Sequence, residues 1–429
     1  MEKNVDMIYG IDDKPALGLR IILGLQHIFA AFGGIILVPV LVSGNLGFDP
    51  ATSAALISGS ILASGVATIV QSHRLWKVGA GVPSLMGTDV TFAAPATAVG
   101  AQFGLPGIMG AIVAGGFIEF LLGFFTKPLL KFFPKVVAGV VISLIGLTLL
   151  ANSVNWIGGG NSANANNTTY VLVGLSVLAF TLAINYYGKG FLKSASIFIG
   201  MVFGYIICIP LGMVDFSNVA ASPIFRIPRP FYSGISFHWS AILAFLPAFL
   251  VGAVGTVGRI KAIEGVTGLE ESDERIEGAI LADGVTTVAA AAVGGLTNTT
   301  FAQNIGLLSI TKVASRHVTI MAGIILTLLG FFPRFAAIIH AMPQPVLGGV
   351  GVMMFGMIAV AGIQLLKDVE FNNRNMMIVA ISLGLGLGVS FRPAILSQFP
   401  PIVGMIFSSG ITTGTIIAIF LNIVLREEK

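Results

Sequence analysis

Residues 79–95 read GAGVPSLMGTDVTFAAP, and residues 299–312 read TTFAQNIGLLSITK. Both stretches interrupt long apolar runs with prolines, glycines, amides or a carboxylate, which are poorly suited to the middle of a membrane helix. Irregular backbone at membrane depth is tolerated only where it is buried in protein or lines a cavity. The two stretches therefore predict broken helices at a buried site in a membrane protein.

The composition of the chain agrees with a membrane environment. Of the 429 residues, 55% are hydrophobic and only 10% are charged, whereas soluble domains carry roughly 25% charged residues. The 54 glycines suit closely packed membrane helices. The net charge of +4 comes without a basic stripe, so we expect a lipid bilayer and no nucleic acid as partner.

The sequence lacks the groupings of residues that usually carry out enzyme chemistry. Cys208 is the single cysteine, and the histidines are scattered without ligand spacing. The sequence contains no nucleophile–base set and no phosphate-binding glycine loop. We therefore expect no enzymatic activity, no metal and no cofactor.

Apolar runs of about 20 residues mark membrane spans, and the sequence predicts fourteen of them. With the N-terminus in the cytoplasm, all but four of the 23 lysines and arginines lie on the inside, as the positive-inside rule requires. The four outside are Arg226, Arg229, Arg334 and Arg392. We therefore expect a multi-pass protein of the cell membrane with both termini cytoplasmic. The predicted spans are 17–42, 51–72, 79–98, 105–125, 134–153, 169–188, 194–214, 240–262, 275–296, 299–315, 317–341, 343–366, 374–391 and 401–425.

The two broken stretches lie in the third and tenth spans, so each is third in a set of seven. Seven is odd, and the second set therefore has the opposite orientation to the first. This arrangement predicts a 7+7 inverted repeat. Broken spans at matching positions of two halves mark the binding site of a secondary transporter.

Several motifs resemble the nucleobase–ascorbate transporter family. Residues 303–312, QNIGLLSITK, resemble its signature of Gln or Glu, Asn, any residue, Gly, four residues, and Thr before a basic residue or Gly. The pair Gln26-His27, the stretch 87–92 and the triplet Ala282-Asp283-Gly284 resemble further family motifs. The resemblance extends over essentially the whole chain.

The resemblance implies an all-α membrane fold with a core and a gate domain. The core comprises spans 1–4 and 8–11, here residues 1–125 and 240–341. The gate comprises spans 5–7 and 12–14, here residues 126–239 and 342–429. Spans three and ten each contribute a short strand, the two strands pairing antiparallel, and a half-helix. Many members are proton or sodium symporters of xanthine, urate or uracil, and several are dimers, so we expect a homodimer.

A nucleobase presents an edge of alternating donors and acceptors. The backbone amides near Val90 and Ala302 are placed to read such an edge, and the Gln303 side chain both donates and accepts. Half-helix N-termini add partial positive charge. By resemblance, Asn304, His27 and Phe355 also belong to the substrate-binding set, with packing as the alternative role for each.

Span eight departs from the family pattern. The family usually has a substrate-binding Glu where this chain has Gly255, and Asp or His where it has Arg259. We hypothesise that Asp89 replaces the missing carboxylate and pairs with Arg259, because a charge at membrane depth needs a partner. Two alternatives are an Arg259 that attracts an anionic substrate and a loss of proton coupling. Asp283 completes the predicted charge network, and Glu119 is assigned a structural role.

Gln303 resembles the xanthine and urate branch, since the uracil branch usually has Glu at this position. We therefore expect a cation-coupled symporter of xanthine or urate, with a uracil permease as the alternative. A channel-like facilitator without ion coupling is the alternative of a different class. The two unlike broken spans favour alternating access over an open pore.

Overall fold

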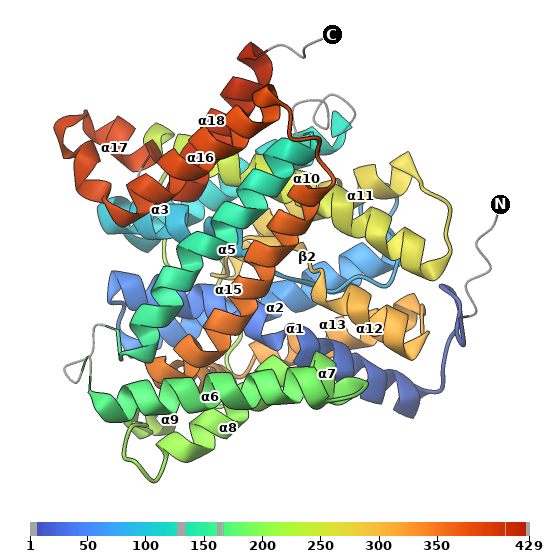
Figure 1. Cartoon of the computed structure of the whole chain (residues 1–429). Coiled ribbons are helices and arrows are strands. Elements are labelled where there is room, and N and C mark those ends of the chain that lie inside the picture. The colour runs from blue at the N-terminus through green and yellow to red at the C-terminus, as the bar shows by residue number, and fades with distance from the viewer. Residues whose placement is uncertain (1–6, 127–133, 161–164, 166, 408, 426–429) are drawn as a thin grey trace.

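The computed structural model describes residues 7–126, 134–160, 165, 167–407 and 409–425 (Figure 1). Within these residues the chain is mostly helical, with two short strands. The elements are α1 (Leu17–Leu46), α2 (Pro50–His73), β1 (Met86–Thr88), η1 (Val90–Phe92), α3 (Ala93–Gly123), α5 (Lys135–Ile157), α6 (Thr168–Tyr187), α7 (Phe191–Ser194), α8 (Ser196–Cys208), α9 (Ser217–Ala221), α10 (Trp239–Thr267), α11 (Asp273–Ala292), β2 (Asn298–Thr300), α12 (Gln303–Thr311), α13 (Arg316–Gly330), α14 (Pro333–His340), α15 (Gln344–Lys367), α16 (Asn373–Phe391), η2 (Pro393–Gln398), α17 (Pro401–Phe407) and α18 (Gly410–Val424).

Local features of the sequence explain where α1 ends and where α2 begins. α1 ends at Gly47, whose φ of 64° is the left-handed conformation that glycine adopts without a Cβ penalty. Asp49 then caps α2, accepting hydrogen bonds from the amides of Ala51 and Thr52. Pro50 occupies the first helical position, where a missing amide hydrogen costs nothing.

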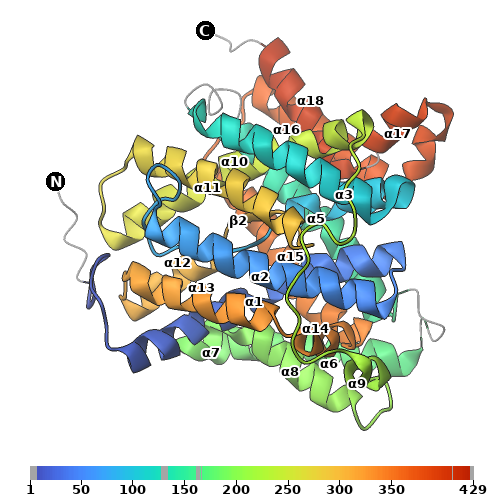
Figure 2. The same cartoon turned by 180° about the vertical axis from the view of Figure 1, so that it is seen from behind.

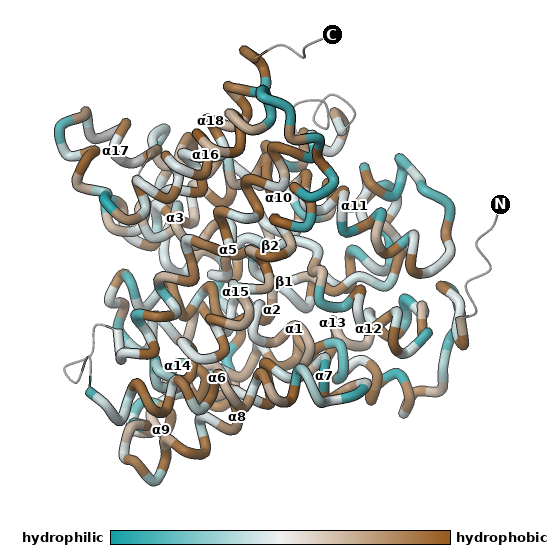
Figure 3. Tube along the Cα trace, viewed as in Figure 1, coloured by the Kyte–Doolittle hydropathy of each residue, from teal (hydrophilic) through white to brown (hydrophobic). Residues whose placement is uncertain are grey.

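The outer helices present apolar side chains to their surroundings. Leu172, Leu175 and Leu182 on α6 are exposed, as are Ile381 and Leu385 on α16, and both helices appear largely brown in Figure 3. Eight helices in the described part of the chain are long and apolar enough to cross a membrane, or nine if α13 and α14, bent by 86°, form one span. The protein is therefore a multi-pass membrane protein, and the fourteen-span count remains a prediction.

The predicted spans 79–98 and 105–125 meet within α3. The helix runs from Ala93 to Gly123, but Gly104 has a φ of 63° and a ψ of −167°, which breaks it into two segments. The predicted span 401–425 is likewise divided between α17 and α18. Broken helices are therefore more frequent than the two stretches that the sequence singles out.

The two predicted strands are confirmed. β1 pairs antiparallel with β2, with Met86 opposite Thr300, Gly87 opposite Thr299 and Thr88 opposite Asn298. All six residues are buried. The pairing continues past the strands, because the amide of Phe301 donates to Leu85 O at 2.8 Å. The two broken stretches, far apart in the sequence, therefore form one unit.

Two sets of helices surround this unit. α1, α2, α3, α10, α11 and α13 pack on one another and on the strands, while α5, α6, α8, α15, α16 and α18 pack together. Figure 1 shows α5 and α15 on the near side of β2, and Figure 2, seen from the opposite direction, shows α2, α13 and α11 on the other side. The paired strands thus lie between the two sets.

Candidate functional site

The site is centred where the two strands end and their half-helices begin. Asp89 follows β1 directly and caps η1, since its Oδ1 accepts from the amide of Thr91 at 2.9 Å. Its other oxygen, Oδ2, is buried and has no hydrogen-bond partner among the described residues. The Asp89 carboxylate therefore sits at a helix N-terminus, where partial positive charge stabilises its anion.

Glu119 lies beside Asp89, and the sequence analysis did not include it in the site. A Cβ built on Gly252 of α10 would lie 3.4 Å from Asp89 Oδ2 and 3.5 Å from Glu119 Oε1. Gly252 thus leaves room for two carboxyl groups to face the same point. Glu119 is only 2% exposed. The signal that would have found it is its position as an acid within a predicted span, which marks a functional site by default.

A second polar cluster joins α10, α11 and β2. The hydroxyl of Thr256 donates to Asp283 Oδ2 at 2.5 Å, and the hydroxyl of Thr299 donates to the same oxygen at 3.4 Å. Arg259 Nη1 donates to Thr299 Oγ1 at 2.8 Å. The predicted network members Arg259 and Asp283 are therefore linked through Thr299, a residue that the sequence analysis passed over.

The hypothesised direct pair of Asp89 and Arg259 is not present in this conformation. In the described part of the chain, no ion pair within 4.0 Å joins these two residues, and Asp89 Oδ2 stays without a partner. The physical reason is that Arg259 turns toward β2 and α11, whereas Asp89 faces Glu119 across Gly252. The two groups belong to neighbouring clusters.

Arg259 occupies the space that a side chain at position 255 would enter. A Cβ built on Gly255 would lie 3.1 Å from Arg259 Nη2 and 3.3 Å from Nη1. Gly258, by contrast, has no heavy atom within 4 Å of such a Cβ, and neither has Gly306 on α12. Gly258 and Gly306 thus leave room for a side chain at their own positions on α10 and α12.

The residues of the family signature have two distinct roles in the fold. Asn304 is fully buried, and its Nδ2 donates to Pro83 O at 2.9 Å, which ties α12 to the other broken stretch. Gln303 is partly exposed and makes no side-chain hydrogen bond within the described residues. Ala302 is exposed and Val90 partly so. The free amide of Gln303 therefore stays available to a ligand.

His27 and Phe355 are both buried, at 2% and 0% exposure. His27 lies on α1, and its Nδ1 has no hydrogen-bond partner among the residues described. Phe355 lies on α15, with its ring 3.7 Å from a Cβ built on Gly351 of the same helix. In this conformation Phe355 packs within the helix set of α5 and α15.

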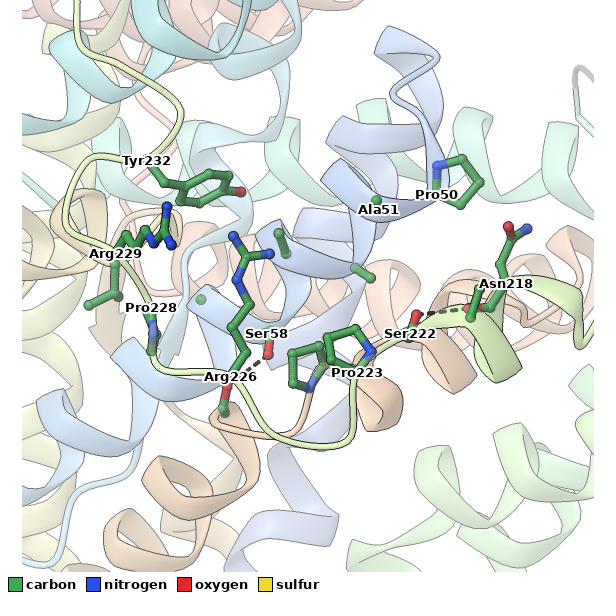
Figure 4. Close-up of a pocket in the computed structure, with 17 residues that line it drawn as sticks. Pro50, Ala51, Ser58, Asn218, Ser222, Pro223, Arg226, Pro228, Arg229 and Tyr232 are labelled. Atoms are coloured by element: carbon green, nitrogen blue, oxygen red, sulfur yellow. Dashed lines mark hydrogen bonds between the residues drawn. The ribbon is translucent and has the colours of Figure 1, made fainter.

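A separate cavity of about 170 Å³ lies between the first turns of α2 and the chain that leads to α10. Figure 4 shows Arg226 and Arg229 beside Tyr232 at this cavity, with Arg226 Cζ 5.6 Å from the ring centroid. Burial raises the pKa of Tyr232, and the Arg226 cation opposes that rise. None of the predicted site residues lines this cavity. In the described part of the chain, no three His, Cys, Asp or Glu side chains are grouped to hold a metal ion.

Known proteins resemble the chain in sequence along its whole length. It matches the model of a family described as "Permease family" over residues 19–395. It is 52% identical to a Clostridium perfringens protein named "Putative purine permease CPE0397", over 99% of this chain and 94% of that one. It is 37% identical to uric acid permease PucJ of Bacillus subtilis, over 95% and 93% of the two chains.

Similar chains also occur among solved structures. The transmembrane domain of a cyanobacterium bicarbonate transporter, BicA, superimposes with a TM-score of 0.61 over 92% of this chain and 99% of that one. Mouse Slc26a9, an anion transporter solved in the inward-facing state, gives a TM-score of 0.62 over 96% of this chain and 69% of that one. At 14% and 12% identity, these likenesses are likenesses of fold.

Proposed function

Because the chain belongs to the Permease family, and with it to the nucleobase–ascorbate transporters, we propose that it is a secondary active transporter of an oxidised purine, xanthine or urate. The observation that carries this proposal is the pair of antiparallel strands followed by half-helices that begin near Asp89 and Gln303. A transporter, and not an enzyme, is the class that such a family and such broken helices support.

The chemistry of the site residues and the names of the relatives both support a purine as the substrate. Gln303 has a free amide that pairs with a ring amide in both directions. Arg259 donates to Thr299 through Nη1, and its guanidinium group has further donors, which suits an anion. Relatives named for uric acid and xanthine support the same class. Uracil is the second candidate, and a direct role of Asn304, His27 and Phe355 in binding belongs to the same proposal.

The arrangement of the two helix sets supports a transport cycle in which one set moves relative to the other. We assign residues 1–125 and 240–341 to a moving core and residues 126–239 and 342–429 to a gate, in fourteen spans of a 7+7 inverted repeat. In the cell membrane, with both termini cytoplasmic, the core carries the ring past the gate together with a proton or sodium ion. A homodimer fits this plan, since the gate then anchors to a second gate.

Proteoliposomes test the proposal. The full-length protein, loaded inside with unlabelled xanthine, should take up labelled xanthine in exchange, which an open channel does not do. Gln303→Ala should reduce exchange at least tenfold. Ser309→Ala, an exposed residue on the same half-helix, should leave it unchanged. Equal losses in both variants, or no exchange of xanthine, urate or uracil by the unmodified protein, would refute the assignment.

A further inference from the structure

Three carboxyl groups and one guanidinium group are gathered around α10. Asp89 is 3% exposed, Glu119 2% and Asp283 0%, and Arg259 is the cation beside them. If all three acids were ionised, the four groups would carry a net charge of −2 in a poorly solvated interior. Such a charge is costly, and buried acids neutralise instead by holding protons. The cluster therefore favours the binding of a proton.

The hydrogen bonds distinguish the three acids. The Asp89 anion is stabilised by the amide of Thr91 and by its place at a helix N-terminus. The Asp283 anion is stabilised by two hydroxyl donors, Thr256 and Thr299. Glu119 receives no hydrogen bond from any residue that the structure describes, and both Asp283 and Asp89 are acidic neighbours of its carboxyl group. Glu119 is thus the acid least able to remain ionised.

The surroundings of Glu119 shield this acid from lipid and join it to the site. It lies on the face of α3 that carries Gly116 one turn earlier, and a Cβ on Gly116 would lie 3.0 Å from Gly284 O of α11. On the α10 side, the same Gly252 position is 3.9 Å from the Phe92 ring, which packs edge-on to Phe249 with centroids 4.5 Å apart. The carboxyl group therefore faces Asp89 in a closed space.

We propose that Glu119 is a proton-binding site that takes over the role of the carboxylate missing at position 255. The inference rests on the proposed transport function. A proton from the outer solution neutralises the Glu119 carboxylate, reduces the negative charge facing an incoming purine anion, and leaves on the inner side after the purine departs. A proton fits because Glu119 is a buried carboxyl group that faces other acids and receives no hydrogen bond in the described part of the chain.

Glu119→Gln imitates the protonated acid and provides the test. In proteoliposomes with a proton gradient, the unmodified protein should accumulate labelled xanthine up to about tenfold per pH unit, as one coupled proton allows. Glu119→Gln should still exchange labelled for unlabelled xanthine, at a raised or lowered rate, yet accumulate none. Its exchange should also lose dependence on pH.

Glu264→Gln is the matched control, because Glu264 is also buried on α10 but pairs with Arg275 at 2.9 Å. It should accumulate xanthine normally. Glu119→Asp keeps a titratable group and should keep accumulation with a shifted pH profile, which separates proton binding from packing. A second readout is proton uptake in detergent on adding xanthine, about one per purine in the unmodified protein and none in Glu119→Gln.

Accumulation by Glu119→Gln at the unmodified level would overturn the inference while leaving the transport function intact. So would accumulation driven by sodium and insensitive to the proton gradient, or a loss of coupling in Asp89→Asn alone. A failure of the unmodified protein to exchange any purine would instead overturn the proposed function. If the Glu119→Gln protein fails to fold, Glu119→Asp becomes the deciding variant. Its accumulation of xanthine must then show a pH profile different from that of the unmodified protein.

Discussion

Replacing Arg259 with glutamine should separate charged from neutral substrates. The guanidinium group lies over Gly255 and donates a hydrogen bond to Thr299. Glutamine keeps a donor for Thr299 but removes the positive charge. If the arginine attracts a purine anion, the loss should fall on urate, which is charged at neutral pH, and spare hypoxanthine, which is neutral.

The size of the effect follows from Coulomb's law. Two unit charges about 5 Å apart interact by about 3 kcal/mol at an effective dielectric constant of about 20. Arg259 is partly exposed, so solvent screens part of this attraction. We expect about 1–2 kcal/mol to remain, which corresponds to a 5- to 30-fold rise in KM for urate. The inhibition constant for hypoxanthine should change less than twofold.

The assay is competition of both purines against labelled xanthine in proteoliposomes at constant pH and ionic strength. Lys261→Gln is the control, because it removes a charge from the same helix where Lys261 pairs with Glu271 on the exposed surface at 2.7 Å. Its KM for urate should stay within 1.5-fold of the unmodified value, roughly the precision needed to resolve 0.2 kcal/mol. An equal loss of affinity for urate and hypoxanthine in Arg259→Gln would refute the electrostatic reasoning and assign Arg259 to structure.

Three further outcomes follow from packing, hydrogen bonding and charge. Gly65→Ala should lower the melting temperature in detergent, because the added Cβ would lie 2.6 Å from Gly323 O and overpacking costs about 1–3 kcal/mol. Gly44→Ala is the control and should leave the melting temperature unchanged, because no heavy atom lies within 4 Å of its added Cβ. Asn304→Ala should destabilise by about 1–3 kcal/mol through the unpaired Pro83 carbonyl, measured by the same melting curve, and an unchanged curve would contradict this. Hydrogen bonds from Thr52 lower the pKa of Asp49 in the folded protein. The ionised Asp49 side chain therefore stabilises the fold fully above the unfolded pKa of about 3.9, and this stabilisation is lost as the pH falls through the lower folded pKa. Asp49→Ala should therefore show a weaker acid dependence of its melting temperature, and parallel curves would count against the cap.

Much of the fold could be predicted because lipid imposes strong rules on sequence. The lengths of the apolar runs predicted the bounds of α1, α2, α5 and α15 to within a few residues. The prolines and glycines of residues 79–95 marked a true interruption. The break at Gly104 falls between the predicted spans 79–98 and 105–125, whereas the sequence did not predict that the break is a single residue within α3.

The site was harder to predict, because contacts across α10 are not encoded in any local pattern. Asp89 and Gln303 were found because polar residues stand out in apolar stretches. Glu119 stands out equally, but its proximity to Asp89 depends on Gly252, a residue 133 positions away that contributes space and no chemistry. The pairing of Asp89 with Arg259 failed for a related reason, since Thr299 offers the arginine a nearer partner.

Gly255 and Arg259 of α10, which depart from the family pattern, can be explained together with the acids Asp89 and Glu119. A carboxylate at position 255 would lie within reach of the guanidinium that now occupies that space, and the two would neutralise each other. With glycine there, Arg259 keeps its charge for a ligand, and the proton-binding acid must come from elsewhere. Asp89 precedes the first segment of α3 and Glu119 lies on its second segment, and the break at Gly104 separates the two segments. In our proposal the purine and the proton therefore bind to two segments that are neighbours in the sequence and that both face Gly252 of α10.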